Sequence, residues 1–311
     1  LRSLWQLRLF RITYESSYMF KNLEVLCKSH ETSRFFFGSK YAIISTGKKR
    51  TEKWGFYSMK KEVMVDMTSG RIAPQILRFA MPVLLGLVFQ RIYNFADSYI
   101  VGHFLGDNAL AAVSVAGVGM YLVFSLIIGL TTGVTVVMSQ YYGAKEEDKV
   151  VKTFFSSIFI ALGMTILVTV IGLLMTRPLL IVLQTPAEVL DAAVLYLRII
   201  CAGSVGTMLY NWISAVLRSL GNSVVPLIFL GISSLLNIVF DILFVAVIPM
   251  GVGGAAFATV LAQIISGVAC LLYAWKILPM LRIRRDKLKL DTYIGKQMLV
   301  YGLPAALQMS I

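Results

Sequence analysis

The stretch FAMPVLLGLVFQRIYNFADSYIVG, residues 79–102, decides the fold class. It is almost continuously apolar, and it is long enough for a helix to cross the hydrocarbon core of a bilayer, which takes about 20 residues. Five further apolar stretches follow, separated by short polar or glycine-containing links. We therefore predict an all-α membrane protein with six transmembrane helices, near residues 76–102, 112–141, 153–175, 193–217, 224–247 and 255–275.

The composition agrees with a membrane protein. Hydrophobic residues make up 58% of the 311 positions and charged residues only 14%, whereas soluble domains contain about 25% charged residues. The net charge of +13 does not indicate a nucleic-acid partner, because the basic residues gather in residues 1–58 and in alternate links between the spans. Basic alternate links predict a multi-pass protein of the inner (plasma) membrane with a cytoplasmic N-terminus.

The regions that flank the six spans lead to separate expectations. Residues 1–58 have no sustained apolar period, so we interpret them as non-native upstream sequence or as a disordered basic extension; Met59 is a plausible start. Residues 59–75 are expected to form a cytoplasmic segment, 76–277 the six-helix transmembrane lobe and 278–297 a basic cytoplasmic linker.

The stretch around Pro82 recurs near the end of the chain. FAMPVLL, residues 79–85, is echoed by YGLPAAL, residues 301–307, and each copy follows a polar or basic stretch. The second copy predicts the start of a seventh helix at 298–311. An even number of spans in each unit gives two parallel repeats, so we expect the chain to be the first half of a twelve-helix protein. Its partners are then the bilayer and the second lobe of the same parent chain.

Two carboxylates lie inside the predicted spans. Asp97 falls in the first span and Asp241 in the fifth. A charged side chain at the bilayer centre costs roughly 2.5–3.5 kcal/mol on insertion scales, which makes each a functional candidate; the alternative is a structural role as a cap or in a helix–helix hydrogen bond. Gln90, Asn94 and Asp97 follow i, i+4 and i+7 spacing and share one helix face.

The fifth span carries a similar polar stripe, formed by Asn237 and Asp241. Both stripes are expected to face an interior cavity rather than lipid, and Asn211 and Thr259 are candidates to line it. A buried carboxyl binds a proton more readily than one in water, and carboxylate and amide oxygens also suit sodium. We therefore predict a coupling ion, H⁺ or Na⁺, with Asp97, Asp241 and Asn237 as the sodium ligands, and no other metal or cofactor.

Pro82 has a separate predicted role. It lacks an amide hydrogen and clashes with the preceding turn, so it predicts a kink in the first span. From the sequence, that kink is either static or able to bend between two states.

Three stretches together resemble the multidrug and toxic compound extrusion (MATE) family. They are residues 82–102, with Pro82, Gln90 and Asp97; residues 217–226; and residues 237–259, from NIVFD to GGAAFAT. The resemblance implies a twelve-helix transporter with two six-helix lobes, which exports drugs or organic cations in exchange for protons or sodium. It also implies a polar cluster in the amino-terminal lobe, formed by Gln90, Asp97, Tyr196, Asn211, Asn237, Asp241 and Thr259.

The sequence departs from the family pattern at two positions. Ser214 stands where some relatives have Asn, which puts in doubt an oxygen cage for sodium. Asn222 replaces the Asp often seen in the fourth loop, which affects the capping of that loop rather than transport.

Two rival functions remain. A lipid-linked saccharide flippase would need a basic cavity, whereas the intramembrane charges here are mainly acidic, with Arg91 and Arg198 expected nearer the helix ends.

The second rival, a membrane prenyltransferase, would need several carboxylates to hold magnesium. The sequence lacks a second acidic cluster, so we do not expect an enzyme. It also lacks a phosphate-binding loop of the Walker type, so we do not expect ATP as the energy source.

Overall fold

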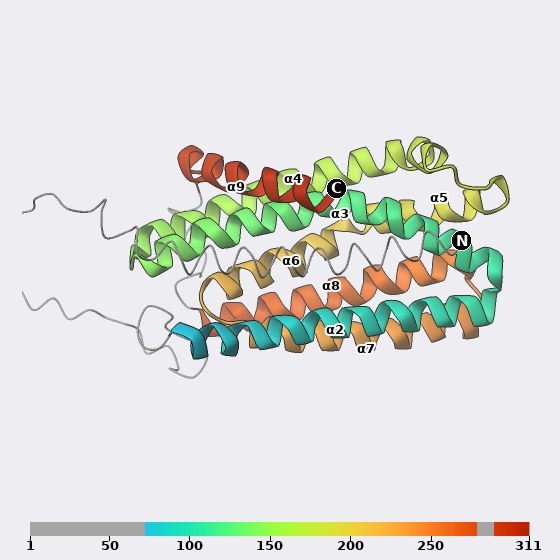
Figure 1. The fold of residues 1–311 in the computed structure, drawn as a ribbon, viewed down its shortest axis with the longest axis horizontal. Coiled ribbons are helices and arrows are strands. Elements are labelled where there is room, and N and C mark those ends of the chain that lie inside the picture. The colour runs from blue at the N-terminus through green and yellow to red at the C-terminus, as the bar shows by residue number, and fades with distance from the viewer. Residues whose placement is uncertain (1–71, 279–288, 311) are drawn as a thin grey trace, which may run out of the picture. The chain divides into compact units, whose positions relative to one another are not determined.

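The computed structural model describes residues 72–278 and 289–310, and Figure 1 shows their arrangement. Residues 1–58, residues 59–71 and residues 279–288 of the predicted linker lie outside the described residues, so the expectations for them stay predictions. The described part of the linker range 278–297 is partly helical, because a helix begins at Thr292. The described residues form helices and no strand. The elements are α2 (Ile72–Leu105), α3 (Asp107–Gly143), α4 (Glu147–Val182), α5 (Ala187–Ala202), α6 (Ser204–Ser219), α7 (Val224–Asp241), the π-helix η2 (Ile242–Val247), α8 (Gly251–Ile277) and α9 (Thr292–Ser310).

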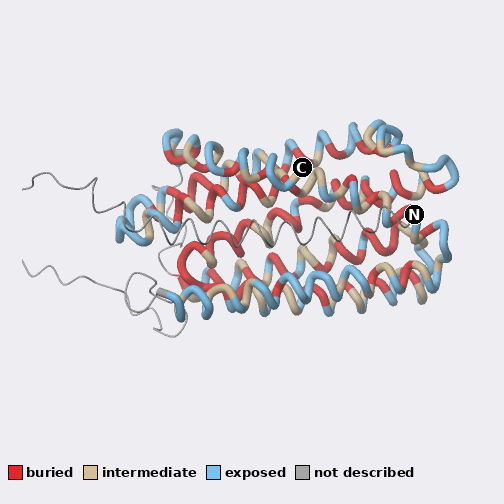
Figure 2. The backbone as a smooth tube through the Cα atoms, in the orientation of Figure 1, coloured by how far each residue is buried: buried red, intermediate tan, exposed pale blue. Residues whose placement is uncertain are grey.

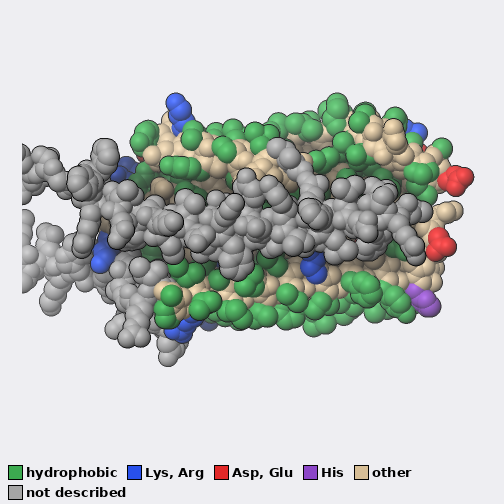
Figure 3. Space-filling view, in the orientation of Figure 1, with side chains coloured by type: hydrophobic (Ala, Val, Ile, Leu, Met, Phe, Trp, Pro, Cys, Tyr) green, Lys and Arg blue, Asp and Glu red, His purple; other side chains and the backbone are tan. Residues whose placement is uncertain are grey.

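The predicted membrane class is confirmed. Five helical spans are long and apolar enough to cross a bilayer, and α5 with α6, bent by 49°, makes a sixth if the pair counts as one span. Exposed apolar side chains cover the described helices, and Lys, Arg, Asp and Glu side chains gather mostly toward the helix ends (Figure 3). Such a distribution suits a lipid-facing surface, since no water is present in the core to solvate polar groups.

Several helices extend beyond the predicted spans, whereas the fifth span, Val224–Val247, has the predicted bounds. α4, for example, runs over Glu147–Val182, where the hydropathy pattern predicts 153–175. The fourth span also differs in shape, since it breaks at Gly203. A β-carbon at Gly203 would lie 2.3 Å from the Val260 side chain, so the absence of a side chain there lets the chain pass very close to α8.

The fifth span changes geometry directly after Asp241. The α-helical α7 ends there, and the next six residues form the π-helix η2. π-helical turns are rare in proteins overall, and those that do occur often lie at functional sites. The change in winding therefore coincides with one of the two intramembrane carboxylates.

The packing places α7 between α2 and α8, and α6 beside α8, while α3 contacts α4, α5 and α6. Of the five unbroken spans, α8 is the most buried and α2 the least (Figure 2). One apolar core cluster contains Phe155 and Trp212, and a second contains Leu197 and Ile200. These cores hold together the helices that carry the polar side chains.

The last helix, α9, packs along α3. A β-carbon at Gly133 would lie 2.1 Å from the backbone oxygen of Met298, so the two backbones are almost in contact, as at small-residue contacts between membrane helices. Tyr141 of α3 donates a 2.9 Å hydrogen bond to Oε1 of Gln297 on α9. The second copy of the proline motif, with Pro304, therefore lies in a helix that packs against α3 and α4.

Candidate functional site

The two intramembrane carboxylates lie next to each other. Asp97 projects from α2 and Asp241 ends α7, and the packing of α2 against α7 brings their carboxyl groups side by side. Asp97 is 8% exposed and Asp241 is fully buried. One residue of the α2 stripe, Asp97, thus meets Asn237 and Asp241 of the other stripe in one buried cluster.

Asn237 links this pair to α8. It lies one turn before Asp241 and is buried, and its Nδ2 donates a 3.1 Å hydrogen bond to Oγ1 of Thr259. The Thr259 hydroxyl donates in turn to the carbonyl of Ala255 at 3.2 Å. The buried Tyr196 of α5 reaches the same threonine with its hydroxyl. Side chains of α2, α5, α7 and α8 therefore meet at one point.

Four buried oxygen atoms of this cluster have no hydrogen-bond partner in the structure: Oδ1 of Asp97, Oδ1 of Asn237, and both carboxylate oxygens of Asp241. Leaving buried polar atoms unpaired costs free energy, and nearly all buried polar atoms in proteins are paired. Oxygen atoms alone suit a proton or a hard cation. Among the described residues no group of three or more His, Cys, Asp and Glu side chains could hold a different metal.

Three other predicted residues are not buried with this cluster. Gln90 and Asn94 lie on α2 but are exposed in this chain. Asn211 is half-buried and donates a 2.7 Å hydrogen bond to the carbonyl of Thr207 in its own helix. Pro82 lies inside a continuous α2, in the half that precedes Asp97.

The sequence reasoning missed Tyr93. Its hydroxyl lies close to the carboxyl groups of Asp97 and Asp241 and to the side chain of Gln90. The signal was present, because Tyr93 precedes Asp97 by four residues and therefore shares its helix face.

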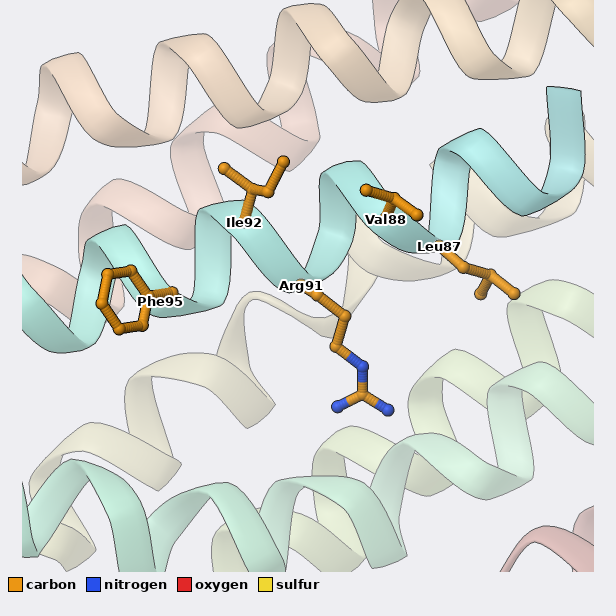
Figure 4. Close-up of a pocket in the computed structure, with 5 residues that line it drawn as sticks. All are labelled: Leu87, Val88, Arg91, Ile92 and Phe95. Carbon is orange, nitrogen blue, oxygen red and sulfur yellow. The ribbon is translucent and has the colours of Figure 1, made fainter. Parts of the chain in front are cut away.

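Arg91 lies near the middle of the α2 span, Ala73–Leu105, rather than nearer its end as the sequence interpretation had it. Its guanidinium projects away from α2, and the surrounding side chains are Leu87, Val88, Ile92 and Phe95 (Figure 4). Among the described residues, the ion pairs are Lys149 with Glu146 and Arg177 with Asp191, so Arg91 takes part in none. It lies off the face that carries Asp97 and belongs to a separate surface of the helix.

Comparison with known proteins identifies the family. The MatE family model matches residues 82–243, which include both Asp97 and Asp241. A probable multidrug resistance protein of Bacillus subtilis, YpnP, is 34% identical over 249 residues, covering 79% of this chain and 55% of the relative. The probable multidrug resistance protein NorM of Thermotoga maritima is 26% identical over 256 residues, covering 81% of this chain and 55% of the relative.

The solved structures agree with the sequence matches. The outward-facing conformation of a multidrug resistance MATE family transporter of the MOP superfamily superimposes with a TM-score of 0.72 at 25% identity, over 78% of this chain and 54% of that protein. The chain spans about half the length of the curated relatives that it matches. The six-span lobe, its polar cluster and these matches together establish that the chain belongs to the MatE family of multidrug and toxic compound extrusion transporters.

Proposed function

We propose that this chain is the amino-terminal lobe of a secondary transporter that exports drugs or organic cations in exchange for protons or sodium. The names of the relatives support export of drugs. The observation that carries ion coupling is the buried group of four unpartnered oxygens on Asp97, Asn237 and Asp241. The proposed setting is the inner membrane, with the N-terminus in the cytoplasm and a second lobe completing the transport path.

The proposed mechanism starts from the two adjacent carboxyl groups. Two carboxylates side by side do not both ionise at low cost, so the pair takes up a proton or a cation that bridges α2 and α7. Loss of that ion leaves unpaired charge between the two helices and favours a conformation in which they separate or admit water. An ion with different affinities for the two conformations shifts the population between them, and Pro82 in α2 is a natural place for the bend.

The test uses the protein produced from its intact gene, reconstituted in vesicles with an imposed proton or sodium gradient. Asp241→Asn keeps the size and hydrogen-bonding capacity of the side chain but removes its titration. We expect normal insertion and efflux of a cationic dye reduced almost to the level of protein-free vesicles. Asp97→Asn is expected to impair efflux less, because Asp97 is slightly exposed.

Asn94→Ala is the matched control, since Asn94 lies on α2 but outside the buried cluster. It is expected to leave gradient-driven efflux close to that of the unmodified protein. Wild-type rates in Asp241→Asn and in the double variant with Asp97→Asn would show that the carboxyl groups are structural and that coupling occurs elsewhere.

A further inference from the structure

A cavity of about 340 Å³ lies between α4, α6 and α8, on helices that carry neither Asp97 nor Asp241. Its volume is at the lower end of the range of small-molecule sites, about 300–1,000 Å³. The lining side chains are almost all apolar or aromatic: Phe154, Ile158, Ala161, Leu162, Thr165, Val205, Met208, Leu209, Trp212, Ile213, Leu271, Ala274 and Trp275.

The few polar atoms near this cavity already have partners. Nε1 of Trp212 donates a 2.8 Å hydrogen bond to Oγ of Ser157, which itself donates to the carbonyl of Phe154 at 2.7 Å. The hydroxyl of Thr165 donates to the carbonyl of Ala161, also at 2.7 Å. A polar ligand would lose its hydrogen bonds to water here without replacing them, which is costly. The chemistry of the lining therefore selects hydrocarbon.

The depth of the cavity matches one leaflet. Along α4 it extends from Phe154 to Thr165, and at 1.5 Å per residue this is about 17 Å. The hydrocarbon core of a bilayer is about 30 Å thick, so the cavity covers about half of it. One end of the cavity lies at Trp275, close to the end of α8. Tryptophan is enriched at the membrane–water interface. The other end is at Val205, beside the break between α5 and α6.

The cavity is open on the apolar outer surface of the helices. Leu162 is 55% exposed, Val205 54% and Trp275 46%, and all three lie on its rim. Phe154 and Trp212, in contrast, are buried at its floor. The cavity is therefore continuous with the surface that the membrane spans present to lipid, and an acyl chain can enter it sideways without leaving the hydrocarbon.

We propose that this cavity binds one acyl chain of a phospholipid from the leaflet on the side of Glu147 and Ile277. The chain lies along α4, over the indole of Trp212, with the ester and phosphate groups at the level of Trp275. This site is independent of the proposed ion-coupling function, because its residues belong to a different part of the lobe.

The test measures quenching of tryptophan fluorescence by brominated phospholipid. The protein from its intact gene is placed in vesicles of phosphatidylcholine brominated both next to the ester and in the middle of the acyl chains, with all tryptophans replaced by Phe except Trp212 or Trp275. We expect strong quenching of Trp212, despite its burial, and strong quenching of Trp275. With Ala161→Phe, which fills the cavity, Trp212 is expected to lose most of its quenching while Trp275 keeps its own.

Ile166→Phe is the control, because it places the same aromatic ring on the exposed face of α4, one residue beyond the cavity. It is expected to change neither signal. If Ala161→Phe does not fold, as judged by gel filtration, Thr165→Met fills the same space. The proposal is overturned if Trp212 is unquenched while Trp275 is quenched, or if a folded filled variant quenches like the parent.

Discussion

Two groups of buried polar side chains in this lobe differ in how they are satisfied. Between α2, α7 and α8, four oxygens of Asp97, Asn237 and Asp241 have no hydrogen-bond partner. Between α4 and α6, the indole of Trp212 donates to Ser157. Elsewhere along the same two helices, the hydroxyls of Thr169 and Ser204 share a further hydrogen bond of 2.8 Å.

The difference distinguishes polar side chains that support the fold from polar side chains that are available to bind an ion. Polar contacts between α4 and α6 recover their desolvation cost within the fold, as is usual for helix contacts in a membrane. The acidic cluster does not recover this cost from protein groups. Uptake of a proton or a cation would give these oxygens a partner, which is the property that the proposed ion coupling requires.

The variant with the largest expected effect is the double substitution Asp97→Asn with Asp241→Asn. Removing both ionisable groups eliminates the cost of holding them together, so the unfolding temperature should rise, by about 2–4 °C for each kcal/mol gained. Gradient-driven efflux should fall to background. Thermal unfolding of the purified protein, measured beside dye efflux, checks both parts, and a lower unfolding temperature would show that the carboxyl groups support the fold.

Ser157→Ala should do the opposite of the double substitution: it should lower stability moderately and leave efflux intact. It leaves the buried indole N–H of Trp212 without an acceptor, which costs about 1–3 kcal/mol of stability. The ion dependence of efflux should not change. Ser157→Thr, which keeps the hydroxyl, is the control. A shift in ion dependence on Ser157→Ala would remove the distinction between the two groups.

The smallest effect is expected at Asn222, a buried polar residue whose oxygen is satisfied. Its Oδ1 accepts a 3.0 Å hydrogen bond from the amide of Val225 at the start of α7. Asn222→Ala should cost about 1 kcal/mol, as for other helix caps, whereas Asn222→Asp should retain the bond. Thermal unfolding of both variants would measure this, and equal losses would mean that the cap contributes nothing.

Much of the fold could be predicted from hydropathy, because each apolar stretch is by itself long enough to cross the bilayer as a helix. The break at Gly203 could not, nor could the close approach of Val260 from α8 to this glycine. The π-helix after Asp241 was not predicted either. Neither feature leaves a periodic signal in the local sequence.

The placement of Asp97 beside Asp241 was expected from polar stripes on two spans. The positions of Gln90 and Asn94 were less well predicted, because helical spacing places residues on a broad face and does not say which of them are covered. Tyr93 was missed for the opposite reason. Its ring looks apolar in a sequence, and only its surroundings show that the hydroxyl lies near the carboxyl groups.

The tight contact at Gly133 has a consequence at the level of the gene. Every single-base change in a glycine codon that yields another amino acid adds a β-carbon, and here that atom would lie 2.1 Å from the Met298 carbonyl oxygen. No missense mutation of this codon by one base can therefore keep α3 and α9 at their present separation. We expect a saturation library read out by efflux to recover only synonymous changes at this codon.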